Sequence, residues 1–231
     1  MKDILISGMA AMGVPLREGA AEQLIAYWKL LEEKNKVMNL TAITGEEDCA
    51  RLHFLDCAAL LRNRSLAGKT LIDVGSGAGF PGLVLKILEP ELKLTLLDSL
   101  GKRVDFQKEV CEALGLEVSC LHARAEEAKE LYGKFDYAAA RAVSRMQLLT
   151  ELCLPFVKKG GEFLAMKGPA PEEEIAEAKN AVRILGGELR SAEKYGIPGT
   201  DAVHSIVCVK KLAPTPPKYP RSWAKIKKSP L

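Results

Sequence analysis

Residues 71–82 read Leu-Ile-Asp-Val-Gly-Ser-Gly-Ala-Gly-Phe-Pro-Gly, and this stretch decides the fold. Its apolar start is typical of a buried strand, and the glycines that follow allow a sharp turn and let a ligand lie against the main chain. Pro81 suits the first turn of a helix, because its missing N–H would have no partner there. A glycine-rich loop between a strand and a helix indicates a nucleotide-binding site, and the alternative is a tight turn without a ligand.

Strand and helix patterns alternate from this loop to about residue 209. The predicted strands are 71–74, 92–97, 118–121, 135–139, 161–166, 188–195 and 203–209. The predicted helices are 81–88, 102–114, 125–131, 146–152 and 172–185. This order predicts an α/β fold of the Rossmann-like kind, with a mostly parallel seven-stranded sheet covered by helices on both faces. The last two strands have no helix between them and predict an antiparallel edge.

The two ends of the chain differ from this alternating region. Residues 1–66 show helical spacing, as at Leu24, Tyr27 and Leu31, and no strand alternation. We therefore expect an N-terminal helical extension over 1–66 that packs on a core domain over 67–213. Residues 214–231 have four prolines among the first seven, which predicts an extended tail.

Composition narrows the class of protein. The chain has 231 residues, of which 48% are hydrophobic and 27% charged, as is usual for a globular protein. No apolar run approaches the roughly 20 residues that cross a bilayer, and the first residues lack the basic opening of a signal peptide. The six cysteines include no C-x-x-C pair and no metal-ligand spacing. We expect reduced thiols in the cytoplasm, no membrane contact and no bound metal.

Positive charge is concentrated at the C-terminal end. The last 18 residues contain no acid and five basic residues, namely Lys218, Arg221, Lys225, Lys227 and Lys228. Without them the net charge of the chain changes from +3 to −2. A mildly acidic body with a basic tail predicts that the tail contacts a polyanion such as RNA.

Two kinds of cofactor compete for the glycine loop. The run from Gly77 to Gly82 matches the dinucleotide pattern G-x-G-x-x-G, and Asp98 follows at the distance of a ribose-binding acid. The longer string Asp73-Val-Gly75-Ser-Gly77-Ala-Gly79 resembles the first motif of class I methyltransferases, whose acid can help to orient S-adenosylmethionine. We therefore expect Asp73, Gly75, Gly77 and Gly79 to bind this cofactor. We favour the methyltransferase, because this longer string places an acid two residues before the first glycine, and because the chain shows no His or Tyr-x-x-x-Lys arrangement for hydride transfer.

Polar residues at the ends of predicted strands are further candidates. Asp98 can accept both ribose hydroxyls, or it can cap the helix that follows. Arg141 is expected to bind a cofactor carboxylate or a substrate phosphate, and the alternative is a surface ion pair. Lys167 ends the fifth strand in the same way and is, like Arg141, a candidate for positioning the reactants. Lys102 and Arg103 are expected to be solvated helix charges.

The kind of methyl transfer is limited by motifs that are missing. After the fourth strand there is no Asp/Asn-Pro-Pro-aromatic motif of adenine amino-methyltransferases and no Pro-Cys pair of cytosine-C5 enzymes. Cys153 lies in an apolar helix end and is expected to pack in the core. Guanine N7 has a free lone pair and no proton to lose, so alignment with the methyl group can supply most of the acceleration. A chain without an obvious catalytic base fits such a reaction, and it equally fits an enzyme whose base is not recognised.

These motifs resemble one family, the bacterial small-subunit rRNA guanine-N7 methyltransferases called RsmG or glucose-inhibited division protein B. The similarity runs from Met38 to the last proline. Its anchors are Met38-Asn-Leu-Thr41, His53-x-x-Asp56, residues 73–82, Asp98-Ser99, Lys102-Arg103, Ala125-Glu126, Arg141-Ala142, Lys167-Gly168 and Tyr219-Pro-Arg221.

The resemblance implies a cofactor, a substrate and their contacts. S-adenosylmethionine, with S-adenosylhomocysteine as product, is expected to contact Gly75, Phe80, Asp98, Ser99, Ala125, Glu126 and Arg141. Phe80 can offer an apolar wall, while the Ala125 N–H and the Glu126 carboxylate can read the adenine. The implied substrate is a guanine in a loop of 16S rRNA, free or in the 30S particle, where a base unstacks more easily than in a duplex. A cytoplasmic monomer is the default expectation.

The chain departs from the family at a few positions. The chain has Leu52 where the family usually has Arg or Lys, and Cys57 where it usually has Ser. Ala224 and Ile226 stand where the family tends to have Gly and Pro. His53 and Asp56, three apart on a predicted helix, are therefore expected to bond to each other rather than to a substrate. Two other functions stay open: a methyltransferase of another RNA, a protein or a small molecule, and a ribosome assembly factor without catalysis. The basic tail disfavours a substrate other than RNA, and the intact glycine loop disfavours the assembly factor.

Overall fold

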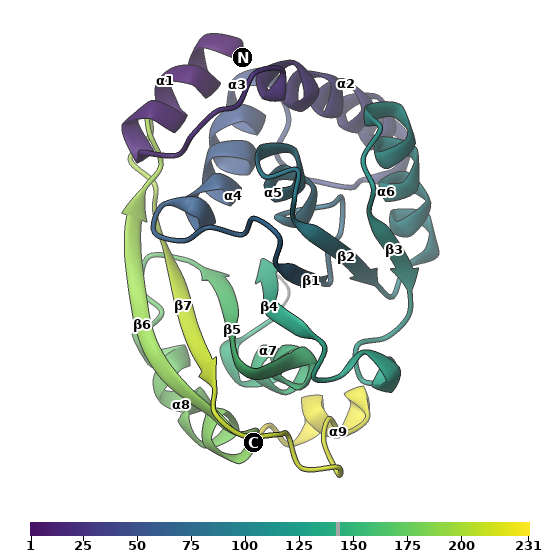
Figure 1. Ribbon diagram of the computed structural model, residues 1–231, viewed down its shortest axis with the longest axis vertical. Coiled ribbons are helices and arrows are strands. Elements are labelled where there is room, and N and C mark those ends of the chain that lie inside the picture. The colour runs from purple at the N-terminus through teal and green to yellow at the C-terminus, as the bar shows by residue number, and fades with distance from the viewer. Residues whose placement is uncertain (142–143) are drawn as a thin grey trace.

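The computed structural model describes residues 1–141 and 144–231, which form a seven-stranded sheet with helices on both faces (Figure 1). The strands are β1 (Thr70–Val74), β2 (Lys93–Asp98), β3 (Ser119–His122), β4 (Phe135–Arg141), β5 (Val157–Lys167), β6 (Gly187–Gly196) and β7 (Val203–Lys211). Their order is β3-β2-β1-β4-β5-β7-β6. Strands β1 to β5 are parallel, and β7 runs antiparallel to β5 and β6. The predicted α/β fold with an antiparallel edge is confirmed.

Helices cover the sheet in two layers, one above and one below it in Figure 1. They are α1 (Lys2–Met12), α2 (Ala20–Met38), α3 (Glu46–Asp48), α4 (Asp56–Ala58), α5 (Gly82–Leu88), α6 (Gly101–Leu114), α7 (Met146–Cys153), α8 (Glu172–Ile184) and α9 (Trp223–Lys228), with a π-helical turn at Cys49–Leu55. Short 3-10 turns lie at Ala59–Leu61, Lys129–Leu131 and Leu154–Phe156. Within the described residues, each helix is too short or too polar to cross a bilayer. Ala142, part of a family motif, lies outside the described residues.

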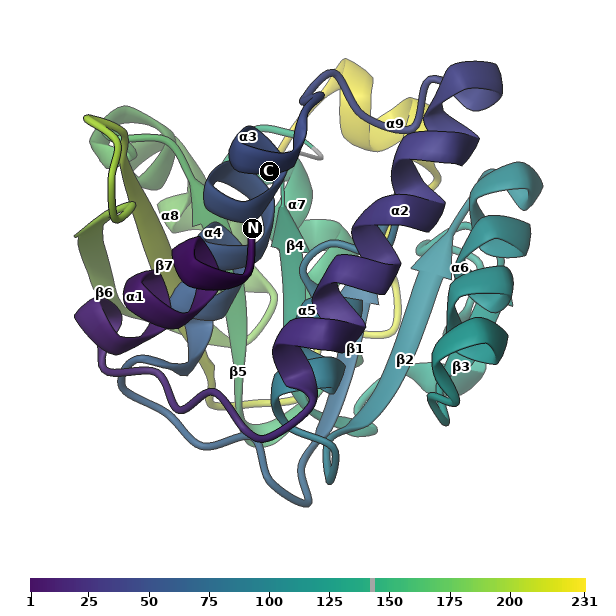
Figure 2. The ribbon, with the colours of Figure 1, turned by 90° about the horizontal axis from the view of Figure 1, so that it is seen from above.

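The core consists of two hydrophobic clusters because alternate strand residues point to opposite faces of the sheet. Leu71 and Leu164 belong to the cluster under α1, α2, α5 and α6. Their neighbours Ile72 and Ala165 belong to the cluster that α7, α8 and α9 cover. Figure 2, which views the molecule from above, shows the N-terminal helices in front of the strands. The N-terminal segment thus shares its face of the sheet with α5 and α6.

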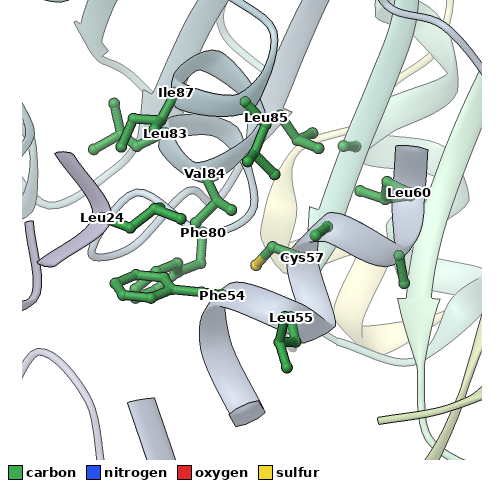
Figure 3. Packing of buried hydrophobic residues seen from close by; sticks show 14 of the residues in the cluster. Leu24, Phe54, Leu55, Cys57, Leu60, Phe80, Leu83, Val84, Leu85 and Ile87 are labelled. Atoms are coloured by element: carbon green, nitrogen blue, oxygen red, sulfur yellow. The ribbon is translucent and has the colours of Figure 1, made fainter. Parts of the chain in front are cut away.

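The N-terminal helices also pack directly on the glycine loop. Figure 3 shows Leu24 of α2 and Phe54 of the π-helical turn close to Phe80, and all three side chains are buried. The Tyr27 hydroxyl donates a hydrogen bond to the Ala78 carbonyl at 2.5 Å. Because this bond joins α2 to the loop, the N-terminal segment helps to define the loop's shape.

The predicted helix over 125–131 is wrong. This segment is a series of turns that ends in the 3-10 turn Lys129–Leu131. Seven residues are too few to make a stable helix without tertiary support. The Tyr132 hydroxyl donates to the Ala125 carbonyl at 2.9 Å and holds the segment as a compact turn.

The prediction of an extended C-terminal tail is also wrong in part, because residues 223–228 form α9. Ile226 is fully buried in the cluster on the α7 side. Arg221 donates from its main-chain N–H, Nε and Nη2 to the carboxylate of Glu151 on α7, at 2.8, 2.9 and 2.6 Å. The proline-rich start of the tail indicated an extended chain, whereas this buried contact fixes its second half against the core.

Candidate active site and its two cavities

The glycine loop follows β1 at the carboxyl edge of the sheet. The Gly75 N–H donates to the Leu97 carbonyl at 2.8 Å, which joins the loop to the end of β2. Gly79 has a φ of 104°, and a Cβ at this position would lie 2.4 Å from the side chain of Leu83. Only glycine fits there, because other residues rarely adopt this φ and have no space for a side chain.

Asp73 supports this loop from inside the core. It is fully buried, and its Oδ2 accepts a hydrogen bond from the Gly82 N–H at 2.7 Å. Its Oδ1 has no partner among the described residues. Burial raises the pKa of Asp73 to about 7, and the bond from Gly82 opposes that rise. Asp73 therefore helps to hold the shape of the loop.

Asp98 ends β2 and connects the loop to α6. Its Oδ2 accepts from the Gly77 N–H at 2.8 Å, and its Oδ1 accepts from the Leu100 N–H at 2.9 Å. The bond from Leu100 holds the turn before α6, but the N-cap residue of this helix is Leu100, so the alternative prediction that Asp98 caps it is wrong. Arg103, expected to be a solvated charge, lies 3.7 Å from the same carboxylate.

A cavity of about 480 Å³, which we call the glycine-loop cavity, opens beside these residues. It is lined by Leu40, Thr41, His53, Gly75, Ser76, Gly77, Ala78, Phe80, Asp98, Ser99, Arg103 and Arg141. Six of the predicted cofactor residues are among them, namely Gly75, Gly77, Phe80, Asp98, Ser99 and Arg141. The other four, Asp73, Gly79, Ala125 and Glu126, are not. Sequence reasoning did not assign Leu40, Thr41 or Arg103 to the site, although Thr41 ends the first motif of the family resemblance.

Phe80 forms one wall of this cavity and is the centre of an aromatic stack. The ring of His53 lies 4.2 Å from it at an interplanar angle of 12°, and the ring of Tyr27 lies 5.3 Å away at 29°. The Arg141 guanidinium carbon lies 4.9 Å from the Phe80 centroid. Phe80 is only 5% exposed, so its position is fixed by this packing.

Arg141 joins His53 to Asp56. Its Nη1 donates to Asp56 Oδ2 and to the Leu52 carbonyl, each at 3.1 Å, and its Nη2 donates to His53 Nδ1 at 2.7 Å. The predicted bond between His53 and Asp56 is therefore wrong, because the guanidinium from β4 lies between them. The alternative of a surface ion pair for Arg141 is wrong as well, since Asp56 is 2% exposed.

These contacts determine the protonation state of His53. A guanidinium has only donors, so His53 Nδ1 must accept and the proton is on Nε2. Nε2 then donates to the Thr41 hydroxyl oxygen at 2.8 Å. Burial, together with the positive charge of Arg141, lowers the pKa of His53 to about 3. His53 is thus neutral at physiological pH, and both ring nitrogens are engaged.

A second cavity of about 440 Å³ also borders Arg141, and we call it the adjacent cavity. It is lined by Ile43, Leu52, His53, Asp56, Arg141, Met166, Lys167, Gly168 and His204. The two cavities share His53 and Arg141 as lining residues, so they adjoin along this shared wall. Lys167, a predicted positioning residue, donates to the Ser144 carbonyl at 2.6 Å and pairs with Glu174 at 2.7 Å.

The family is shown by comparison with known proteins. A family model described as rRNA small subunit methyltransferase G matches residues 20–200. The chain belongs to this family. It is 46% identical to the ribosomal RNA small subunit methyltransferase G of Alkaliphilus metalliredigens over 235 residues, which covers 100% of this chain and 98% of that protein.

Solved structures share the fold of this methyltransferase G family member. A crystal structure of a SAM-dependent methyltransferase from Aquifex aeolicus aligns with a TM-score of 0.53 at 20% identity, over 71% of this chain and 93% of the other. The TYW2 protein of M. jannaschii, solved in complex with AdoMet, aligns with a TM-score of 0.53 at 14% identity, over 65% and 72% of the chains. These similarities show a class I, Rossmann-like methyltransferase fold.

The C-terminal residue of this family member contacts α7. Gln147, in the first turn of α7, donates to the main-chain oxygen of Leu231 at 3.4 Å, and this turn closely follows the strand that ends in Arg141. Four of the predicted RNA-binding residues, Lys218, Lys225, Lys227 and Lys228, are exposed. The fifth, Arg221, has Glu151 as an intramolecular partner instead.

Proposed function

We propose that the chain transfers a methyl group from S-adenosylmethionine to N7 of a guanine in small-subunit ribosomal RNA. One observation carries this proposal: two cavities meet at the wall formed by His53 and Arg141. A methyl donor in the glycine-loop cavity and a base in the adjacent cavity would approach each other beside this shared wall, where the two cavities adjoin. Positioning of two reactants in this way is the main requirement of a transfer that needs no proton removal.

The glycine-loop cavity fits S-adenosylmethionine in its chemistry. We propose that the Asp98 carboxylate at the end of β2 accepts hydrogen bonds from the ribose hydroxyls. Phe80 supplies an apolar wall for the cofactor. We assign the carboxylate of the cofactor to Arg103, which is 40% exposed, because the guanidinium of Arg141 is already bonded to protein groups. Ala125 and Glu126, beyond the end of the neighbouring strand β3, stay our proposed contacts of the adenine.

Guanine N7 suits a site of this kind. S-adenosylmethionine supplies an electrophilic methyl group, and its transfer leaves a neutral thioether while the positive charge moves to the guanine ring. The N7 lone pair forms the new bond, and no proton leaves the base. His53 is neutral with both nitrogens bonded, so it is not available as a general base. An acceptor that requires deprotonation would be served poorly by this residue.

We propose that the exposed lysines of the tail anchor the RNA. Lys218, Lys225, Lys227 and Lys228 can contact phosphates without reading the sequence, and the tail that carries them ends beside α7. In this division of the chain, residues 67–213 bind the cofactor, residues 1–66 complete both cavities, and residues 214–231 bind RNA. We expect a cytoplasmic monomer that acts on 16S rRNA or the 30S particle.

The test is methyl transfer with tritiated S-adenosylmethionine and unmodified small-subunit RNA or particles, followed by mapping of the label. Label on N7 of one guanine is the expected result. Asp98→Ala is expected to abolish most of the cofactor binding, whereas Asp105→Ala, an exposed acid on α6, is the matched control. Label on another atom, or no label despite tight cofactor binding, would overturn the substrate assignment.

A further inference from the structure

His204 on β7 is a cavity residue that the proposed function does not yet use. It lines the adjacent cavity but not the glycine-loop cavity. Its side chain is 33% exposed, so a ligand can reach it. Its Nδ1 lies 2.8 Å from Asp56 Oδ1, and Asp56 is the same buried carboxylate that binds Arg141.

Asp56 fixes the tautomer of His204. A carboxylate only accepts hydrogen bonds, so the His204 proton must be on Nδ1. Asp56 also accepts from the Tyr195 hydroxyl at 2.7 Å. Although burial raises the pKa of Asp56, its bond with His204 and the charge of Arg141 lower it below its ordinary value, so Asp56 is ionised. Neutral His204 therefore offers Nε2 as a fixed lone-pair acceptor.

The shape of guanine predicts which of its atoms lie next to His204 Nε2. N7 has to face the glycine-loop cavity, because the methyl donor lies there. The N1–H and the 2-amino group, at the Watson–Crick edge, then point into the adjacent cavity, which His204 also lines. Leu52 and Met166 supply apolar surface on which the flipped base can pack, as flipped bases do in other enzymes.

We propose that His204 is a specificity-determining residue whose Nε2 accepts a hydrogen bond from N1–H of the target guanine, held in place by Asp56 and Tyr195. This inference rests on the proposed function and names how the acceptor base is recognised. Adenine has a lone pair rather than a proton at N1, so it would place two acceptors against each other. A buried polar group left without a partner is the usual basis of strong discrimination.

The same contact favours the reaction itself. As positive charge develops on the guanine ring, N1–H becomes more acidic and its hydrogen bond to His204 becomes stronger. An interaction that is stronger in the transition state than in the ground state raises the rate of the chemical step. The proton stays on N1 throughout, so the reaction balances without a base.

A first test uses the wild-type protein and RNA with an altered base at the target position. Inosine keeps N1–H and lacks the 2-amino group, whereas 2,6-diaminopurine keeps N7 and lacks N1–H. We expect the single-turnover rate to fall less than about 5-fold with inosine and roughly 100-fold with 2,6-diaminopurine. Equal rates on guanine and 2,6-diaminopurine would overturn the proposal.

Variants of His204 separate recognition from packing. His204→Phe removes the acceptor and is expected to lower the single-turnover rate on guanine RNA roughly 30-fold. On 2,6-diaminopurine RNA the variant should cause no further loss of rate. His204→Gln, which keeps an acceptor oxygen, is expected to recover most of the rate. The same fold-reduction of His204→Phe on both RNAs would show that His204 does not meet N1. Unchanged S-adenosylmethionine affinity verifies that each variant is folded, and a wild-type protein that methylates no guanine would instead refute the proposed function.

The pH profile gives a further readout. The hydrogen bond with Asp56 raises the pKa of His204, and burial and Arg141 oppose that rise. Lys167 lines the same cavity, and the Tyr195 ring lies 6.2 Å from His204. Because protonated Nε2 is a donor and repels N1–H, the single-turnover rate should rise with pH through this raised pKa. A rate that falls over the same range would contradict the proposed contact, and the profile of His204→Gln should be flat.

Discussion

Replacement of Arg221 by methionine tests whether this residue holds the tail or binds RNA. The sequence assigns Arg221 to RNA, whereas in the structure it makes a three-bond contact with Glu151. The Glu151 side chain is 1% exposed and that of Arg221 22% exposed. Methionine keeps the length and apolar stem of the side chain but removes the guanidinium, so that only the main-chain N–H still bonds the buried carboxylate.

The expected loss of stability is large. Removal of one partner from a buried ion pair destabilises a protein by roughly 3–5 kcal/mol, because the other charge is left uncompensated. The partial exposure of Arg221 favours the lower limit, about 3 kcal/mol in the free energy of unfolding. For a chain of this size that corresponds to a fall in Tm of roughly 6–12 °C. Glu151→Gln combined with Arg221→Met should recover part of the loss, since no buried charge is then left alone.

Urea unfolding followed by circular dichroism measures this effect, and RNA binding is measured on the same samples. The matched control is Arg190→Met, because Arg190 pairs with Glu188 at the surface, where both side chains are about half exposed. That pair should contribute less than about 1 kcal/mol. If Arg221→Met unfolds within about 0.5 kcal/mol of the wild type while RNA affinity falls, the structural role of Arg221 is refuted and the RNA contact stands.

Three other outcomes are expected. Asp98→Ala should weaken S-adenosylmethionine affinity by roughly 10- to 100-fold in calorimetry and leave RNA binding unchanged; unaltered cofactor affinity would remove Asp98 from the ribose site. The raised pKa of Asp73 gives a stabilising contribution that is complete below about pH 4 and is lost as pH rises through about 7. The unfolding free energy of Asp73→Asn relative to the wild type should therefore increase by on the order of 3–4 kcal/mol over this range, and a constant difference would contradict it. Replacement of Lys225, Lys227 and Lys228 by glutamine should reduce the slope of log affinity against log salt by about 2 to 3, whereas an unchanged slope would show that α9 makes no phosphate contact.

Local sequence patterns were sufficient for most of the fold. The glycine loop, the alternation of strands and helices, and the unpaired last two strands predict the sheet and its antiparallel edge, because each signal lies within a short segment. Helix α9 could not be predicted in this way. It depends on Ile226 reaching the core and on Arg221 meeting Glu151, which is 70 residues away in the chain. A contact between such distant residues leaves no periodic pattern in either segment.

In the candidate site, too, local motifs predict some residues and miss those that distant parts of the chain bring together. Gly75, Gly77 and Asp98 follow from motifs that are local to one strand end, and all three line the glycine-loop cavity. The hydrogen-bond network around Asp56 cannot be predicted from a local motif, because His204 is 148 residues away from Asp56 in the chain. The sequence pattern suggested a bond between His53 and Asp56 from their spacing alone. The guanidinium that separates them comes from another strand, and only the sheet topology shows that it reaches them.

The charges around the shared wall explain why this network suits the proposed reaction. The reaction moves one positive charge from the donor sulfur in the glycine-loop cavity to the guanine ring in the adjacent cavity. Arg141 within the wall is compensated by Asp56 at 3.1 Å, and His53 is neutral because its pKa is lowered to about 3. A protonated His53 would add a cation beside the donor and the acceptor and oppose the arrival of charge on the ring. The buried arginine therefore has two effects: it holds His53 in place, and its charge adds to the effect of burial in keeping His53 from becoming a second cation.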